Sequence, residues 1–359
     1  MADMLTPLKT EVRKVDDLSH EARRFRTIEN AASEETSFGW VTPEDPSGGS
    51  FLFEDLDGGP ATWLRLRHDV KKLPAEQVRM HLAAAKRAKG RALTARERRE
   101  LKDDLAEKLL PRILPTTRNI DALLFAEKRL LLVFSSSKSA LDAVGETLRG
   151  SFGEVLQSRL TAGTLAGAVH GPDVVAKLQP TRFPGGGMRQ MVIESDADFL
   201  GQEFLTWLWW RCETAAGGTF TLRGERTVGI AFDSMLQFAA PEDETETTLR
   251  HGLPSRSDEA RAALRHGRLL AKAQLLVAEG ARQWTVAIAG ASLALSARLP
   301  EDADECECDA DRTADRAANW LALHEIVDGL FRQFLAVRVG AGWREESQAM
   351  AEWMHGGES

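Results

Sequence analysis

The chain has 359 residues, of which 43% are hydrophobic and 28% are charged. This composition is normal for a globular protein and excludes a globally disordered chain. A chain of this length is expected to form two domains or one elongated subunit. The formal net charge of −8 by itself argues against a protein that binds nucleic acid.

Cysteine content and hydropathy limit the cellular compartments in which the protein is expected. The three cysteines, Cys212, Cys306 and Cys308, are too few for a disulfide scaffold, and their odd number leaves at least one unpaired. The N-terminal sequence has no apolar core of a secretion signal, and the most apolar stretch, residues 199–210, is too short to span a bilayer. We therefore expect a cytoplasmic protein without a membrane partner.

The charge is unevenly distributed along the chain. The basic segment, residues 65–118, holds 16 Lys/Arg and 7 Asp/Glu, a local net charge of +9, so the remainder carries −17. A basic segment attracts phosphate while an acidic body repels it, and this separation suits a protein that binds duplex DNA.

The elements before the basic helices carry weak signals. Residues 1–36 are polar and patchy, and a short helix is expected through His20–Asn30. Short strands are expected at Ser50–Phe53 and Thr62–Arg67. The second strand alternates basic with apolar side chains, which predicts a half-buried strand with its basic side outward.

Two helices are expected next. The first follows Pro74, a residue suited to a first turn, and runs to about Lys89. The second begins at Thr94, which forms a capping box with Glu97, and ends before Pro111. Because only about four residues join them, an antiparallel helical hairpin is expected.

The remaining pattern predicts further strands and helices on both sides of a boundary. A β-hairpin is expected at Ile120–Phe125 and Leu130–Ser135, followed by a helix that ends near Gly150. The Gly- and Pro-rich stretch 150–187 is the expected boundary between an N-terminal part, residues 1–183, and a C-terminal part, residues 188–359. In the C-terminal part, strands are expected at Arg189–Ile193, Thr219–Arg223, Thr227–Asp233, Gln283–Ala289 and Ser292–Arg298, and helices at Asp198–Glu213, Asp258–Ala278 and Asp315–Val337. The pattern predicts an α+β fold with mixed, mainly antiparallel sheets, packed helices and a protruding basic helical hairpin.

Cations of the basic segment are the candidate DNA contacts. The first choices are Arg79, Lys86, Arg87, Lys89, Arg91, Arg98, Arg99, Lys102 and Arg118, and the second choices are Lys71, Lys72, Arg65 and Arg67. A row of cations matches the phosphate charge of a duplex, one per ~1.7 Å, without reading bases. A solvated helical face, partly neutralised by its own acids, is the alternative that charge alone leaves open. The stretch Lys86–Arg91 contains no acid and is the first part to test.

Two other clusters have simpler explanations. Trp207, Trp209 and Trp210 resemble a stacking platform for bases, but aromatic residues all round a helix are more often core. Cys306 and Cys308 have a C-x-C spacing without a second pair, which favours an acidic loop over a metal site.

Catalytic motifs are not found in the sequence. It has no phosphate-binding loop, nucleophile elbow or zinc-protease motif, and its carboxylates follow no spacing typical of a Mg²⁺ site. We therefore expect a protein that is not an enzyme, with no catalytic residue, no metal and no cofactor. A Mg²⁺-dependent DNA-processing nuclease and a protein-interaction module that grips an acidic partner remain alternatives.

Three segments resemble the RdgC family of recombination-associated proteins. The first is Gly39–Pro43, GWVTP, close to a GWVPP-type element, and the second runs from Lys72 to Arg112 and ends in LLPR. The third, Leu130–Gly153, looks like the strand-then-helix element of the family. Together they span about residues 39–153, in the order of the family, and the Trp-rich stretch 199–210 looks like a longer, divergent branch.

The resemblance implies a homodimer of curved subunits that closes into a ring around double-stranded DNA. It implies a nucleoid-associated protein that binds with little sequence preference and modulates RecA-dependent recombination by occupying DNA. Family members carry an aromatic residue after LLPR, implicated at the gate of the ring. Here that segment, residues 113–119, has no aromatic residue, although Arg118 remains available to phosphate.

Overall fold

The computed structural model describes residues 3–10, 25–33, 35–43, 45–48, 57–58, 60–152, 157–181, 197–214, 217–239, 246–300 and 309–356. Its strands pair antiparallel in one continuous sheet that is covered by helices, and this confirms the expected α+β class. Within these ranges, the helices lack the combination of length and apolar character needed to cross a membrane.

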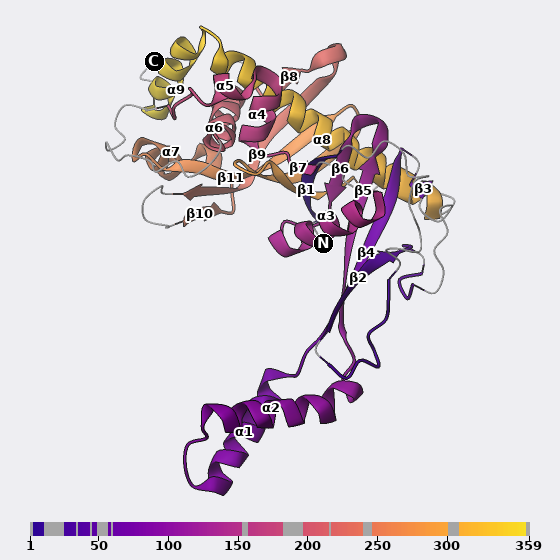
Figure 1. Cartoon of the computed structure of the whole chain (residues 1–359). Helices are drawn as coiled ribbons and strands as arrows, with labels where there is room; N and C mark the ends of the chain where they lie inside the picture. Colours follow the sequence, from indigo (N-terminus) through magenta and orange to yellow (C-terminus); the bar gives the residue numbers. More distant parts are fainter. Residues whose placement is uncertain are drawn as a thin grey trace.

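The elements follow the chain in two groups (Figure 1). The first group comprises β1 (Asp3–Thr10), β2 (Glu35–Val41), β3 (Asp57–Gly58), β4 (Ala61–Lys71), α1 (Ala75–Lys89), α2 (Ala95–Leu109), η2 (Leu110–Arg112), β5 (Thr116–Phe125), η3 (Ala126–Lys128), β6 (Leu130–Val133), α3 (Lys138–Phe152), β7 (Gln157–Arg159), α4 (Ala162–His170) and α5 (Pro172–Val175). The second comprises α6 (Phe199–Glu213), β8 (Thr219–Thr221), η4 (Arg223–Glu225), β9 (Thr227–Ala239), β10 (Glu246–Arg250), η5 (Pro254–Arg256), α7 (Asp258–Arg265), β11 (Leu269–Glu279), β12 (Arg282–Ala289), β13 (Ala294–Arg298), α8 (Asp309–Val339) and α9 (Trp343–Met354).

Strand β1 joins the two groups into one sheet. The strand order is β10-β9-β11-β12-β13-β1-β6-β5-β4-β2, so both ends of the sheet are edge strands. Residues 3–5 of β1 pair with β13, whereas residues 6–9 pair with β6. The sheet therefore crosses the boundary expected between residues 183 and 188 without a break.

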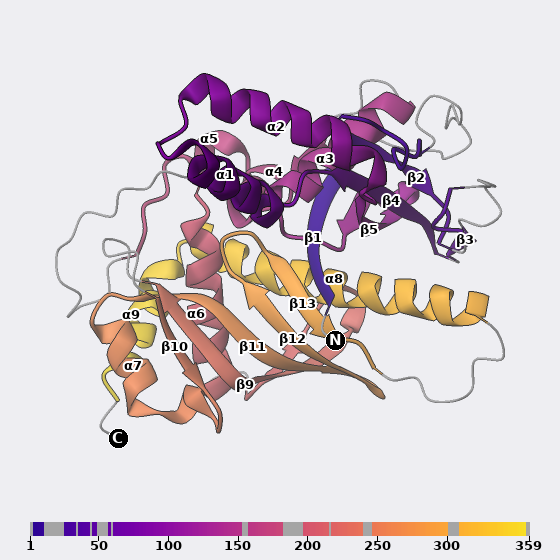
Figure 2. The same cartoon turned by 90° about the horizontal axis from the view of Figure 1, so that it is seen from below.

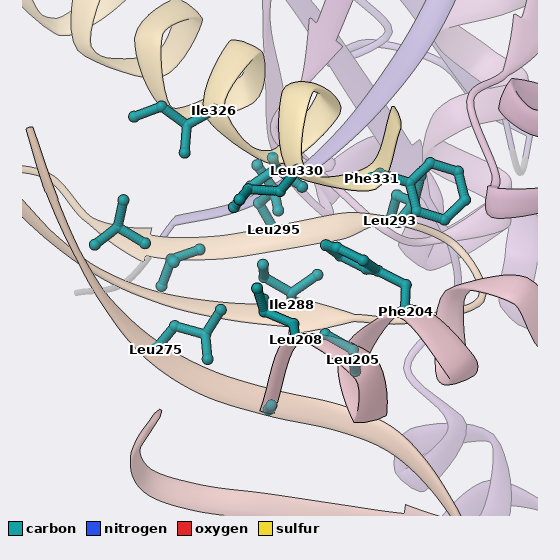
Figure 3. Close-up of a cluster of buried hydrophobic side chains, with 14 of the residues drawn as sticks. Phe204, Leu205, Leu208, Leu275, Ile288, Leu293, Leu295, Ile326, Leu330 and Phe331 are labelled. Atoms are coloured by element: carbon teal, nitrogen blue, oxygen red, sulfur yellow. The ribbon is translucent and has the colours of Figure 1, made fainter. Parts of the chain in front are cut away.

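Buried side chains form a core on each face of the sheet. The larger core joins α6 and α8 to strands β11, β12 and β13, as Figure 3 shows for Phe204, Leu275 and Phe331. The smaller core packs α3 against β4, β5 and β6 through residues such as Leu66 and Val144. Helix α3 therefore covers the face of the N-terminal strands opposite to α8.

Helices α1 and α2 form a helical arm, residues 75–109, that stands away from the sheet (Figure 1) and overlaps the body when seen from below (Figure 2). Strands β4 and β5, with β2 paired along the outer edge of β4, extend from the body as a ribbon, and the arm follows the end of this ribbon. Both helices agree closely with the expected boundaries. The hairpin β5–β6, the helix α3 and the helix α6 also confirm their sequence predictions.

Three sequence predictions are wrong in their described parts. Residues 25–30, the end of the helix expected at His20–Asn30, are not helical. The helix expected at Asp258–Ala278 ends at Arg265, and a strand begins at Leu269, because Gly267 adopts a positive φ of 77° and breaks the helix. Strand β1 lies in a stretch that had been read as polar and patchy. The strands expected at Ser50–Phe53 and Arg189–Ile193 lie outside the described residues.

Candidate nucleic-acid interface

The ribbon of β4 and β5 determines where the helical arm lies. Antiparallel pairing runs from Thr62 opposite Leu124 to Val70 opposite Thr116, at which point the chain leaves for α1. Leu66 and Ile120 anchor the ribbon in the smaller core. The basic helices therefore lie at the far end of the ribbon, away from the body.

Local sequence signals define the two arm helices. Gly90 ends α1 with a φ of 65°, a left-handed conformation that favours glycine. Thr94 Oγ1 accepts a hydrogen bond from the Glu97 amide at 3.2 Å, and the Thr94 amide donates to Glu97 Oε2 at 2.8 Å. The expected capping box is thus confirmed.

Packing within the arm is sparse, which leaves its cations exposed. Helix α1 has no buried residue, and α2 buries only Leu105, with Leu93 and Leu110 adding support beside it. All of the first-choice cations are exposed: Arg79, Lys86, Arg87, Lys89, Arg91, Arg98, Arg99, Lys102 and Arg118.

Charges on α2 segregate into two flanks. At 100° per residue, Arg98, Lys102 and Arg99 fall within an arc of about 100°. The acids Glu100, Asp103 and Glu107 occupy the adjoining flank, whereas Leu105 is buried and Leu101 is half-buried. One side of α2 therefore presents a basic ridge that its own acids do not interrupt.

The Lys86–Arg91 end is partly neutralised, contrary to the sequence prediction. Glu97 reaches back across the turn and accepts hydrogen bonds from Lys89 Nζ at 2.6 Å and from Arg91 at 2.7 and 3.0 Å. These contacts hold the pKa of the Glu97 carboxyl well below its usual range. This pairing is not apparent from the sequence, because Glu97 follows Arg91 by six residues and the two side chains meet only because the chain turns between α1 and α2.

The other arm cations differ in their partners. Arg79 pairs with Glu76 at 2.8 Å. The Nε atoms of Arg87 and Arg98 donate to the backbone oxygens of Ala83 and Leu93, respectively. By contrast, no ion pair with any residue in the described ranges is found for Lys86, Arg87, Arg98, Arg99, Lys102 and Arg118.

Three further cations of the segment were not singled out from sequence. Arg96 is 88% exposed and pairs with Glu100 at 2.7 Å, while Lys108 and Arg112 are exposed near the end of the arm. A helical-wheel projection would have placed Arg96 and Lys108 outside the basic ridge of α2.

The second-choice cations on β4 are engaged inside the protein. Lys71 is fully buried, and its ammonium donates to the backbone oxygens of Ile28 and Glu29. Arg67 binds Asp69 at 2.7 Å, and Arg65 binds Asp121 at 2.6 Å. The expected outward basic side of this strand is therefore wrong, because the backbone at Ile28, Glu29 and Pro46 lies over it. Lys72, just beyond β4, is exposed.

The tryptophan cluster is core, as expected. Trp207, Trp209 and Trp210 are all less than one-tenth exposed. Burial also raises the pKa of the neighbouring Cys212 thiol to about 12. In the described ranges, no group of three or more His, Cys, Asp or Glu residues is arranged to hold a metal ion, and Cys306 and Cys308 lie outside those ranges.

Comparison with known proteins locates the resemblance in the N-terminal part. Residues 6–167 match the model of the RdgC family, which is described as "Putative exonuclease, RdgC". The recombination-associated protein RdgC of Psychromonas ingrahamii (strain DSM 17664 / CCUG 51855 / 37) is 26% identical over 145 residues, which cover 39% of this chain and 47% of that relative. The aligned stretch thus covers about half the length of this relative. The resemblance to the RdgC family is confirmed here and includes the whole helical arm.

Proposed function

We propose that this RdgC-like chain binds double-stranded DNA through the helical arm, with little preference for sequence. The observation that carries the proposal is the basic ridge Arg98, Arg99 and Lys102, together with Lys86 and Arg87. These exposed cations make no ion pair with the described residues and stand apart from the body. Cations in such a row contact phosphates, which are the same for every sequence.

Neutralising the ridge tests the proposal. The double variant Arg98→Gln/Lys102→Gln should weaken binding to all duplex sequences alike and should flatten the salt dependence by about one unit of slope per lost phosphate contact. Fluorescence anisotropy with a labelled random-sequence duplex, measured across a salt series, gives both quantities.

A matched variant separates local contact from net charge. Arg223→Gln/Arg344→Gln removes the same charge from exposed positions on the body, in η4 and α9. It should leave affinity near the wild-type value at ~150 mM salt, where screening acts over ~8 Å. Equal affinity of the arm variant and wild type for duplex DNA would exclude the arm as the binding site. If the chain bound an acidic protein and were not retained on DNA, the interaction-module alternative would be favoured.

We further propose a homodimer that encircles duplex DNA in the nucleoid and antagonises the RecA recombinase by occupying its substrate. Support comes from the curved placement of arm and body and from the match to a recombination-associated relative. Mass measurements with and without duplex test the assembly, because a closed ring of this kind requires an even number of subunits on DNA. A monomer on DNA would contradict the ring.

A nuclease is a second candidate because the matched family is described as an exonuclease. An end-labelled duplex incubated with the protein and Mg²⁺ or Mn²⁺ distinguishes the two functions. The binding proposal expects a shifted but intact strand, whereas shortening of the strand that EDTA stops would establish metal-dependent cleavage.

A further inference from the structure

An exposed aromatic side chain lies between the helical arm and α3. Phe38, on the edge strand β2, is 38% exposed, and its ring stacks on His68 with the centroids 4.4 Å apart and the planes 24° apart. An aromatic ring that is large, exposed and already stacked presents one face to a protein neighbour and leaves the other accessible.

Strand register places a cation in the same row. Phe38 lies opposite His68 on β4, and His68 lies opposite Arg118 on β5, so the three positions form one cross-strand row. The next row, Trp40 and Leu66 with Ile120, packs in the core beneath α3. Because side chains two residues apart share a face of a strand, Phe38 and Arg118 lie on the face that α3 covers further along.

The surroundings of this row suit a nucleic acid strand. Arg118 and Lys72 are both exposed, and neither pairs with an acid among the described residues. Asp69, which precedes Lys72 by three residues, is fully buried on the opposite face and is bound by Arg67. A flat aromatic ring with unpaired cations elsewhere on the same surface is the combination that holds a single strand, with bases on the ring and phosphates on the cations.

We propose that Phe38, with Arg118 in the same cross-strand row, is a stacking site for an unpaired nucleobase, so that this surface also engages single-stranded DNA. The inference rests on the proposed DNA-binding function and adds a contact that the phosphate-binding arm does not provide. Burial and the nearby charges of Arg118 and Lys72 lower the pKa of His68 against the opposing effect of Asp69. A neutral imidazole therefore backs the Phe38 ring.

An abasic strand isolates the stacking contact. Wild-type protein should bind oligothymidylate more tightly than an abasic strand of equal length, because both carry the same phosphates. Phe38→Ala should remove most of this difference and weaken thymidylate binding by roughly 5- to 150-fold, the range known for base–aromatic stacking. Binding to an intact duplex should change by less than about two-fold, since paired bases are not available to the ring.

Two further variants control for structure. Phe38→Trp keeps an aromatic face and should retain the thymidylate preference, whereas Phe38→Leu keeps apolar bulk on the edge strand and should lose it. Val174→Ala, at an exposed apolar position on α5, should change the affinity for neither oligothymidylate nor the abasic strand. Melting temperatures show whether each variant is folded, and Phe38→Leu replaces Phe38→Ala if the latter is not.

The outcomes separate this inference from the function on which it rests. A wild-type protein without preference for bases over abasic sites, or a Phe38→Leu variant that keeps the preference, would overturn the stacking site alone. A Phe38 variant that lost thymidylate binding and duplex binding in equal measure would also overturn the stacking site. Failure of Arg98→Gln/Lys102→Gln to weaken duplex binding would instead remove the proposed function of the arm.

Discussion

Glu97 controls the charge at the tip of the helical arm. One carboxylate caps the start of α2 and binds Lys89 and Arg91 from the turn before it. All three side chains are solvent-accessible, so the ion pairs contribute little to stability. Their larger effect is on function, because they occupy two cations that could otherwise meet phosphate.

Glu97→Gln should therefore strengthen duplex binding. Glutamine can keep the capping box, since its side-chain oxygen still accepts from the Thr94 amide, while the negative charge is lost. Releasing Lys89 and Arg91 should steepen the dependence of log affinity on log salt concentration by about one to two units. Anisotropy titrations of a random-sequence duplex measure this slope.

Glu100→Gln is the matched control for this change. It removes the same charge from a pair with Arg96, which lies outside the basic ridge of α2. A similar steepening in both variants would mean that net charge, rather than release of Lys89 and Arg91, governs binding.

His324 on α8 should give the stability of the chain a pH dependence, because its pKa is lowered in the folded protein. Burial is the largest cause of its lowered pKa, and Arg332 and Lys128 act in the same direction against Asp328 and Glu325. As pH falls below about 6.5, the unfolded chain takes up this proton before the folded chain does. The contribution is therefore favourable above that pH and is lost on acidification.

His324→Gln should flatten the pH dependence of stability. The melting temperature of the wild type should fall more steeply than that of the variant between about pH 7.5 and 5.5. His81→Gln, at an exposed position on α1, should keep the wild-type slope. Identical slopes for His324→Gln and wild type would show that other groups dominate acid unfolding.

At the scale of elements, α2 depends on its capping box because it has little tertiary packing. Leu105 is its only buried residue. Thr94→Ala should destabilise the helix by about 1 kcal/mol, which corresponds to roughly five-fold faster amide exchange in its first turns. Hydrogen exchange measured in α2 and in β11 checks this, since β11 should be unaffected. Equal acceleration in both would mean that the arm and the body unfold together.

Elements with local signals could be predicted from sequence. The capping box at Thr94, the glycine at position 90 and the proline at 111 bound α1 and α2 within a residue or two. The Trp-rich helix α6 was equally clear, because its apolar residues cover most of its circumference. Such signals depend on residues a few positions apart, which a single sequence displays.

Elements defined by distant partners could not be predicted. Strand β1 contains Pro7, and a proline argues against a central strand. Pro7 is tolerated because it lies between residues 3–5, which pair with β13, and residues 8–10, which pair with β7. Strand β11 is rich in Ala and Leu, residues that favour helices, and only its neighbours β9 and β12 make it a strand.

The candidate interface shows the same division. The sequence shows how many cations the basic segment contains, but it does not show which of them are available to phosphate. Lys71 is consumed by carbonyls at residues 28 and 29, and Phe38 joins Arg118 only through strand register. Availability depends on contacts that the sequence does not display, and for Lys71 the contact spans the 43 residues that separate it from Ile28.

At the scale of the whole molecule, β1 and α8 join the N-terminal and C-terminal parts. Trp320 of α8 meets Phe134 edge to face, and Glu325 binds Lys128 at 2.7 Å. Further along, Phe331 packs on Phe204 of α6. The single helix thus contacts both parts.

Two glutamates within this architecture form ion pairs that differ in burial and should differ in energy. Glu203 of α6 and Arg338 of α8 bind at 2.6 Å with side chains only 5% and 6% exposed. Glu203 also accepts from the Thr181 amide at 2.6 Å. Glu325 instead binds Lys128 and Arg226 in pairs whose side chains are 33% to 50% exposed.

Glu203→Gln should therefore lower the free energy of unfolding by about 3 to 5 kcal/mol, because it leaves the Arg338 guanidinium buried without its counter-charge. Glu325→Gln removes two pairs but should lower it by less than about 1 kcal/mol per pair, since water already screens these charges. Urea denaturation of both variants measures the two values, and added salt should narrow only the smaller effect. If Glu325→Gln proved as destabilising as Glu203→Gln, burial would not determine the energy of these ion pairs. The contact between α8 and the β5–β6 hairpin would then hold the two parts together.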